Sequence, residues 1–282
     1  MLNFSFYDTA DSDLALERHR VSTDTPGVEL RRERSPGGLW ERIKITSAAG
    51  ADAIGRPVGC YDTLTLPSMH TLDFEMQDDA QNEIAKELCR ICELSSIIPD
   101  RILVVGLGNP DLTPDAVGPE TAARVEPTMQ LRRADEAAFL ALECSEIAVI
   151  APGVSSKSGI ESADIIKGVC RRISPSLVIA IDALASRSPS RLGTTIQISD
   201  SGIHPGTGLG GRGASLNKDT LGVPVIAIGV PTVINSKYFT DGDGETSSAE
   251  TLFVSPKDIG EIIKSAAKII GGGINQAFGI YY

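Results

Sequence analysis

Three short apolar runs, each followed at once by small or polar residues, constrain the fold of this chain more than any other feature. The runs cover 102–105, 147–150 and 177–181, and the intervening segment 165–173 carries isoleucine and valine at helical spacing. Short continuous apolar runs are typical of strands buried on both faces, and strands that alternate with helices form parallel sheets. We therefore predict an α/β fold: a three-layer α/β/α domain with a mostly parallel central sheet.

Other periodic segments extend this scheme. Alternation of apolar with polar or charged residues predicts strands at 39–45 and 61–66, and two further apolar runs predict strands at 194–198 and 225–230. Helical spacing behind acidic residues predicts a helix over 78–94. A final helix is predicted to begin after the capping residue Ser255 and to end before the glycines 271–273.

The chain also contains polar segments without sustained periodicity. Residues 1–34 are rich in Asp, Ser, Thr and Arg, and we expect them to form an exposed, loosely attached arm. The acidic segment 238–250 is expected to be a surface loop, whereas the glycine-rich segment 200–213 has the turn chemistry of an ordered loop.

Composition excludes several classes of function. The formal net charge of −11 opposes binding to a nucleic-acid backbone, which requires clustered Lys and Arg. No segment approaches the ~20 consecutive apolar residues of a membrane span, and residues 1–10 lack the features of a signal peptide. We expect a cytoplasmic protein without direct nucleic-acid or membrane partners.

Two aspartates follow the predicted buried strands. Asp115 lies in a turn after the first run, where Pro114 and Gly118 constrain the backbone, and Asp182 directly follows the third run. Two carboxylates held close together do not both ionise easily, so one acts as an acid while the other activates water. Aspartates at strand ends also serve as helix caps and turn formers, so the residues alone leave both interpretations open.

Other chemistries fit the sequence less well. In the dinucleotide-binding pattern G-x-G-x-x-G, the third glycine after Gly106 and Gly108 would fall at Asp111, where a negative charge would face the pyrophosphate. No G-x-S-x-G element is present for a serine nucleophile, and His204 stands by itself in the glycine-rich loop. The three histidines are scattered, so we predict neither a metal nor a cofactor.

Long motifs across the chain resemble the germination protease family of spore-forming bacteria. These motifs are VGLGNPDLTPDAVGP, APGVSSKSGIES, VIAIDALASRSPSRLGTTIQISDSGIHPGTGLGGRG, TLGVPVIAIGVPTVI and LFVSPKDIGEIIKSAAKIIGGGINQAFG. The resemblance implies an atypical aspartic-type endopeptidase of the spore core that degrades small acid-soluble spore proteins. It places the catalytic carboxylates at Asp115 in TPDA and at Asp182 in IDALA.

The resemblance also implies a self-processing zymogen. The stretch SDLALE, residues 12–17, resembles the family's processing site and predicts a cut between Ala15 and Leu16. Residues 1–15 would then form a propeptide, and residues 16–282 a single peptidase domain.

A shorter resemblance leaves alternatives open. The G-x-G-N pattern with an acid six residues after Asn109 is similar to hydrogenase-maturation endopeptidases, which implies a related fold and a metal-assisted alternative. A peptide-binding module without activity is the rival from another class. The region 233–252 is shorter than in the germination proteases, which leaves homo-oligomer formation open, and His19, Arg187, Asp200 and His204 lie in matching blocks without an assigned role.

Overall fold

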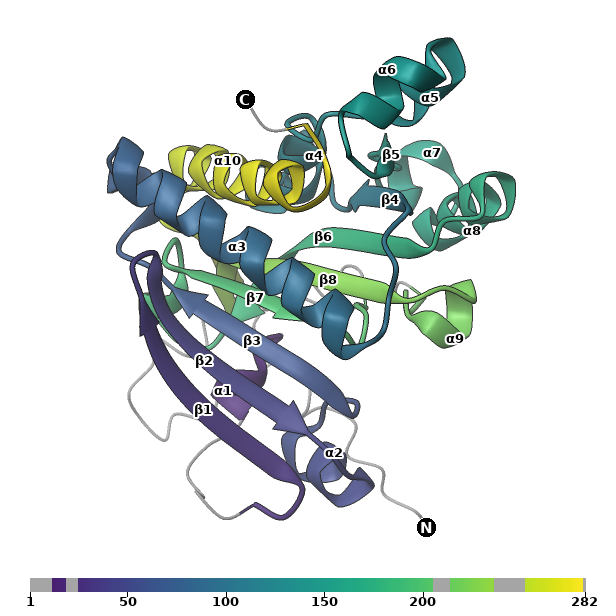
Figure 1. Ribbon diagram of the computed structural model, residues 1–282. Coiled ribbons are helices and arrows are strands. Elements are labelled where there is room, and N and C mark those ends of the chain that lie inside the picture. Colours follow the sequence, from purple (N-terminus) through teal and green to yellow (C-terminus); the bar gives the residue numbers. More distant parts are fainter. Residues whose placement is uncertain (1–11, 19–24, 205–213, 236–251, 281–282) are drawn as a thin grey trace, which may run out of the picture.

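One mixed β-sheet forms the centre of the molecule (Figure 1). The computed structural model describes residues 12–18, 25–204, 214–235 and 252–280, and within these ranges nine strands join in the order β1-β2-β3-β7-β8-β6-β4-β5, with β9 paired to β8. The strands are β1 (Val28–Ser35), β2 (Gly38–Ile45), β3 (Gly59–Thr65), β4 (Arg101–Gly106), β5 (Glu146–Ile150), β6 (Leu177–Ser186), β7 (Thr195–Ser199), β8 (Val225–Asn235) and β9 (Phe253–Val254).

The predicted α/β class is confirmed, but only part of the sheet is parallel. Strands β5, β4, β6 and β8 are parallel neighbours, whereas β1, β2, β3, β7 and β9 all pair antiparallel. The connection between β1 and β2 shows the cause, because only two residues, Pro36 and Gly37, separate these strands. So short a link permits only an antiparallel hairpin, while parallel neighbours need a crossover.

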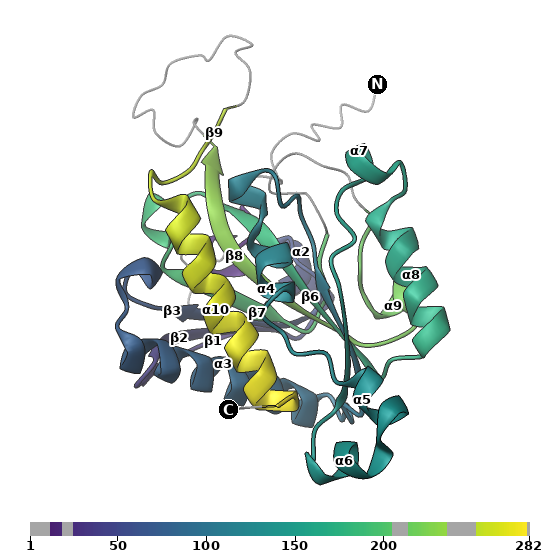
Figure 2. The ribbon, with the colours of Figure 1, turned by 90° about the horizontal axis from the view of Figure 1, so that it is seen from above.

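Helices cover both faces of the sheet, which gives the expected three layers. Figure 2 shows α3 and α10 on one side and α8 and α9 on the other. The α-helices are α1 (Ala15–Arg18), α2 (Ala48–Ile54), α3 (Phe74–Leu94), α4 (Val117–Ala122), α5 (Met129–Ala134), α6 (Glu136–Ala141), α7 (Ser155–Ser158), α8 (Ser162–Ile173), α9 (Lys218–Leu221) and α10 (Ile259–Phe278). Three 3₁₀ turns complete the described elements: η1 (Met69–Thr71), η2 (Thr113–Asp115) and η3 (Pro189–Arg191).

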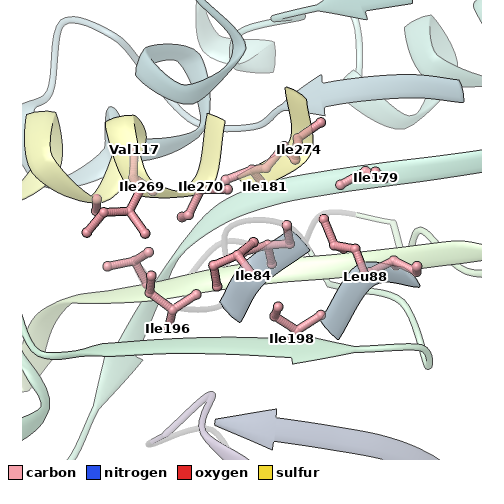
Figure 3. Packing of buried hydrophobic residues seen from close by; sticks show 14 of the residues in the cluster. Ile84, Leu88, Val117, Ile179, Ile181, Ile196, Ile198, Ile269, Ile270 and Ile274 are labelled. Carbon is pink, nitrogen blue, oxygen red and sulfur yellow. The ribbon is translucent and has the colours of Figure 1, made fainter. Parts of the chain in front are cut away.

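The largest hydrophobic core lies between the sheet and helices α3 and α10, and isoleucine dominates it (Figure 3). Contrary to the sequence prediction, helix α10 continues through glycines 271–273 and ends at Phe278. A Cβ atom on Gly273 would lie 2.7 Å from Ile84 of α3. The glycines therefore allow the two helices to approach closely, and this packing outweighs their low helix propensity.

Three boundaries differ from the sequence prediction for local reasons. Helix α3 begins at Phe74, four residues early, because the Asp73 carboxylate caps it by accepting a hydrogen bond from the Met76 amide. The connection between β2 and β3, for which no element was predicted, contains α2, and Ser47 caps the N-terminus of this helix. Strand β1 lies within the expected arm; it has no apolar periodicity because it is an edge strand with mostly exposed side chains.

The remaining predicted segments lie partly beyond these ranges. Residues 205–213 of the glycine-rich loop and the whole acidic segment 238–250 are outside the described residues, as is His19. Among the helices described, none has the length and apolar character needed to cross a membrane.

Candidate active site

Asp115 ends the 3₁₀ turn η2, between β4 and α4. Its side chain is 9% exposed, and its Oδ2 accepts a 2.8 Å hydrogen bond from the Asn109 amide. The loop curls back onto this aspartate because Gly108 has a φ of +111°, and a Cβ there would lie 2.0 Å from the Asp115 carbonyl oxygen. Only glycine allows that close approach, so the sequence G-x-G-N fixes the position of Asp115.

Asp182 lies inside β6 and not at its end, because this strand continues to Ser186 in pairing with β8. The local sequence Ala183–Ser186 is small and largely apolar, and the neighbouring strand extends equally far. Val178, Ala180 and Leu184 pack in a second core on the α8 face, and side chains alternate along a strand. Asp182 therefore points to this face, where it is 3% exposed and its Oδ1 accepts a hydrogen bond from the Ala183 amide at 2.9 Å.

The loop 107–109 connects the two aspartates. At one end, the Leu107 amide donates a 2.8 Å hydrogen bond to the carbonyl oxygen of Ile181, the residue before Asp182. Two residues later, the Asn109 amide binds the Asp115 carboxylate. Parallel pairing of Gly106 with Ile181 brings both segments to the same edge of the sheet, so the structure places the two aspartates in one region.

Burial favours the protonated form of Asp115. Removal from water raises the pKa of its carboxyl group above the ordinary value of 3.8, and the hydrogen bond from the Asn109 amide opposes this rise only in part. A raised pKa favours the protonated form of a carboxyl group, which is the form that a general acid needs.

Residues 12–18, here called the N-terminal segment, pack against the α8 face of the sheet. Ser12, Leu14 and Ala15 are 0% exposed and Asp13 is 7% exposed, so the expectation of an exposed arm is wrong for this part. Leu14 joins the same core as Leu184. The polar segment is buried because the folded domain supplies hydrogen-bond partners for its backbone and acids, which composition alone does not reveal.

The pairing of β7 with β8 and of β8 with β6 places the N-terminal segment near Asp182. The Ala15 amide donates a 2.9 Å hydrogen bond to Oε1 of Gln197 in β7, Gln197 pairs with Gly229 in β8, and Gly229 pairs with Asp182 in β6. Neighbouring strands are about 4.8 Å apart, so the Cα atoms of Gln197 and Asp182 are separated by roughly 10 Å. The predicted cleavage site, Ala15 and Leu16, thus lies over the row of residues that contains Asp182.

Three residues that the sequence left without a role, Asp200, Arg187 and His204, lie at separate positions in the structure. Asp200 accepts a 2.7 Å hydrogen bond from the Cys60 amide, a contact within the scaffold. The Arg187 amide binds Glu17, and His204 lines a cavity of about 30 Å³ together with Asp13 and Arg56. Burial and the charge of Arg56 lower the pKa of His204, which favours its neutral form.

Sequence reasoning missed Arg56 and Gln197. Arg56 follows Gly55, which ends α2, in a segment for which no element was predicted, and Gln197 is one of three polar residues that alternate with isoleucine in β7. Nothing local in the sequence distinguishes Gln197 from Thr195 and Ser199, so its contact with the N-terminal segment is visible only in the structure. For the metal alternative, the described ranges contain no group of three or more His, Cys, Asp or Glu side chains suited to hold an ion.

Comparison with known proteins defines the class. The sequence profile of the germination protease family, peptidase family A25, matches residues 9–243. The germination protease of Caldanaerobacter subterraneus subsp. tengcongensis is 37% identical over 304 residues, covering 94% of this chain and 93% of that protein. The Clostridium perfringens protein is 34% identical, with 94% of each chain covered. The chain therefore belongs to the germination protease family and is a peptidase.

Two further similarities differ in extent. The germination protease of Bacillus subtilis is 41% identical over 233 residues, which cover 80% of this chain and 63% of that protein. Among solved structures, a [NiFe] hydrogenase maturation protease, HycI from Thermococcus kodakarensis, aligns with 62% of this chain and 93% of its own length at 18% identity and a TM-score of 0.35.

Proposed function

We propose that this peptidase is an endopeptidase that initiates the degradation of small acid-soluble spore proteins during germination. Asp115 and Asp182 are its catalytic carboxylates, and water is the nucleophile. Asp115, whose pKa burial raises, holds the proton and acts as the acid, while Asp182 activates water. The observation that carries the proposal is the loop 107–109, which hydrogen-bonds both to the Asp115 carboxylate and to the residue before Asp182.

The same site supports self-processing. We propose that the chain is made as a zymogen that cuts itself between Ala15 and Leu16, because the N-terminal segment crosses the sheet on the face to which Asp182 points. Substrate proteins need that same face, so the bound segment blocks them until it is released. The site requires no metal or cofactor in this proposal, and the setting is the cytoplasm of the spore core.

The catalytic pair is tested with purified small acid-soluble spore protein as substrate. We expect Asp115→Asn and Asp182→Asn each to abolish cleavage while the fold persists. Asp111→Asn is the matched control, because Asp111 lies in the same loop but is 72% exposed in its ion pair with Lys157. Full activity of either site variant contradicts the pair. Inactivity of the unchanged chain towards every peptide favours a binding module.

Self-processing is tested by mass spectrometry of the full chain held at neutral and mildly acidic pH. Because the pKa of Asp115 is raised, its protonated fraction grows as the pH falls, and we expect faster loss of residues 1–15 in mild acid. The Asp115→Asn chain should remain intact under both conditions. Equal cleavage of both chains indicates a contaminating protease and contradicts the proposal.

A further inference from the structure

We infer that Gln197 is a positioning residue for the proposed peptidase reaction. Its side-chain amide holds the main chain of the substrate beside the bond that is cut, by binding the N–H of the residue before the cut and the carbonyl oxygen two residues further back. The inference rests on the proposed function. It concerns the placement of the scissile bond and not the choice of substrate side chains.

The Gln197 amide binds the N-terminal segment through both of its polar atoms. Its Oε1 accepts a 2.9 Å hydrogen bond from the Ala15 amide, and its Nε2 donates a 3.3 Å hydrogen bond to the Asp13 carbonyl oxygen. A carboxamide carries an acceptor and a donor side by side, so one glutamine can bind a carbonyl group and an N–H of the same peptide at once. Both contacts are to the main chain, so they place a peptide without selecting its sequence.

Burial makes these two contacts informative. Gln197 is 8% exposed, in the middle of β7. Buried polar atoms ordinarily find partners within the fold, because leaving one unpaired is costly. In the part of the chain that the structure describes, both hydrogen bonds of this side chain go instead to the N-terminal segment. Removal of residues 1–15 therefore leaves an acceptor and a donor facing the site, where the main chain of a substrate can replace that of the segment.

The Gln197 amide also lies close to the proposed chemistry. Gln197 belongs to the same row of paired residues as Asp182, with Gly229 between them. The Ala15 nitrogen is joined to the carbonyl carbon of the proposed cut through a single Cα atom, so about 2.5 Å separate nitrogen and carbon. A hydrogen bond to that nitrogen restricts where the reacting carbon lies, and a misplacement of about 1 Å can lower a rate roughly 10²-fold. Gln197 thus acts on the rate through geometry, without touching a reacting atom.

Peptides with an altered backbone test the contact. The self-processed chain is given the peptide of residues 10–19, or the same peptide with an ester oxygen in place of the Ala15 N–H. We expect the ester to lower kcat/KM about tenfold, mostly through kcat, as the loss of one buried hydrogen bond predicts. Gln197→Ala should lower kcat/KM for the normal peptide by a similar factor, and the ester should then cost less than about twofold more.

A second ester peptide is the control for the backbone change. It lacks the Leu14 N–H, which in the segment donates to the Ser12 hydroxyl at 3.2 Å and not to the domain. Whatever this ester costs, the cost should be the same for the parent and the Gln197→Ala chain. An Ala15 ester that costs both chains equally overturns the inference.

Two variants separate positioning from packing. In Gln197→Glu, a carboxylate can accept from the Ala15 amide but cannot donate to a carbonyl oxygen, whereas the protonated group can do both. The deficit of this variant relative to the parent should therefore shrink as the pH falls, and a constant deficit contradicts the two-bond contact. Thr63→Val is the control, because Thr63 is 1% exposed, pairs with Gln197, and its hydroxyl has no hydrogen-bond partner within the described ranges. It should keep the parent activity, and a loss equal to that of Gln197→Ala overturns the assignment.

Hydrogen exchange tests the contact without catalysis, in the Asp115→Asn chain that is expected to keep residues 1–15. Adding Gln197→Ala should speed exchange of the Ala15 amide about tenfold. The Asp13 amide, which donates to the Ala185 carbonyl oxygen, should be nearly unaffected. Equal acceleration of both amides would show that Gln197 merely holds the segment down, and unchanged exchange at Ala15 would remove the contact; either result overturns the inference. A chain that cleaves no peptide contradicts the proposed function, and this measurement still decides the role of Gln197.

Discussion

The parallel and antiparallel halves of the sheet differ in how they use charge. In the parallel half, β6 is buried along its whole length and Asp182 is its one ionisable residue. In the antiparallel half, β2 and β3 present Arg42 and Asp62 to Glu87 and Arg90 of α3, which form a network of ion pairs. Asp182 is thus the one ionisable side chain of an otherwise apolar strand, whereas Asp62 and Glu87 are held by arginines in a structural network.

The largest expected difference between the halves is in activity. Asp182→Asn should lower kcat by roughly 10²–10⁴-fold, the usual contribution of a general acid or base. Asp62→Asn should change kcat less than about threefold, because Asp62 packs with α3 on the opposite face of the sheet. Turnover of spore protein by both variants, with folding checked by circular dichroism, decides between them. A large loss of activity in the Asp62 variant would contradict the proposed difference in function between the two halves of the sheet.

The second expected difference between the two halves is in how much a buried side chain stabilises the fold. Ile181→Ala in β6 removes a fully buried side chain and should lower the free energy of unfolding by about 2–5 kcal/mol. Leu30→Ala in the edge strand β1, where the side chain is only partly buried, should cost about 1 kcal/mol or less. Urea denaturation measures both. Similar losses would show that the hairpin β1–β2 contributes to stability as fully as the parallel core.

The network of charged residues should make the stability of the fold depend on pH. Burial, reinforced by the hydrogen bond and negative charge of Glu87, raises the pKa of Asp62 to about 8, while arginine contacts lower that of Glu87. The folded chain then keeps a proton that the unfolded chain releases above the ordinary aspartate pKa of 3.8. Stability contributed by this proton is present in acid and is lost as the pH rises towards 8.

Asp62→Asn tests this proton directly. We expect the stability difference between parent and variant to shift in favour of the variant from about pH 5 to about pH 7.5, measured by urea denaturation. Asp135→Asn, which alters only an exposed helix cap, is the matched control and should leave the pH slope unchanged. A parent-minus-variant difference that does not vary with pH contradicts the shared proton.

The smallest expected effect is that of chelation. Peptidase activity should survive EDTA unchanged, because both proposed catalytic groups are carboxylates that act on water without an ion. The assay is spore-protein cleavage before and after dialysis against the chelator. Loss of activity that one divalent ion restores would replace the acid–base pair with a metal-assisted mechanism.

The sequence predicted the strands and turns that depend on residues close together in the chain. Apolar runs located β4 and β6, and the motif around Gly108 located the turn that holds Asp115. It did not predict the extension of β6 beyond Asp182, which depends on pairing with β8. Nor did it predict the burial of Asp13 or the hydrogen bonds of Glu17, because the partners of both residues lie about 170 residues away along the chain. Contacts that distant leave no periodic pattern in local composition.

Helix α1 has a consequence for the proposed self-processing. The bond between Ala15 and Leu16 lies in a single helical turn, closed by a 3.4 Å hydrogen bond from the Arg18 amide to the Leu14 carbonyl oxygen. One turn has little intrinsic stability, and such turns open within about a microsecond. The turn is therefore held in place by the burial of Leu14 and Ala15 and not by its own hydrogen bond. The proposed cut between Ala15 and Leu16 then depends on the release of these two side chains from the sheet, and not on the unwinding of one helical turn.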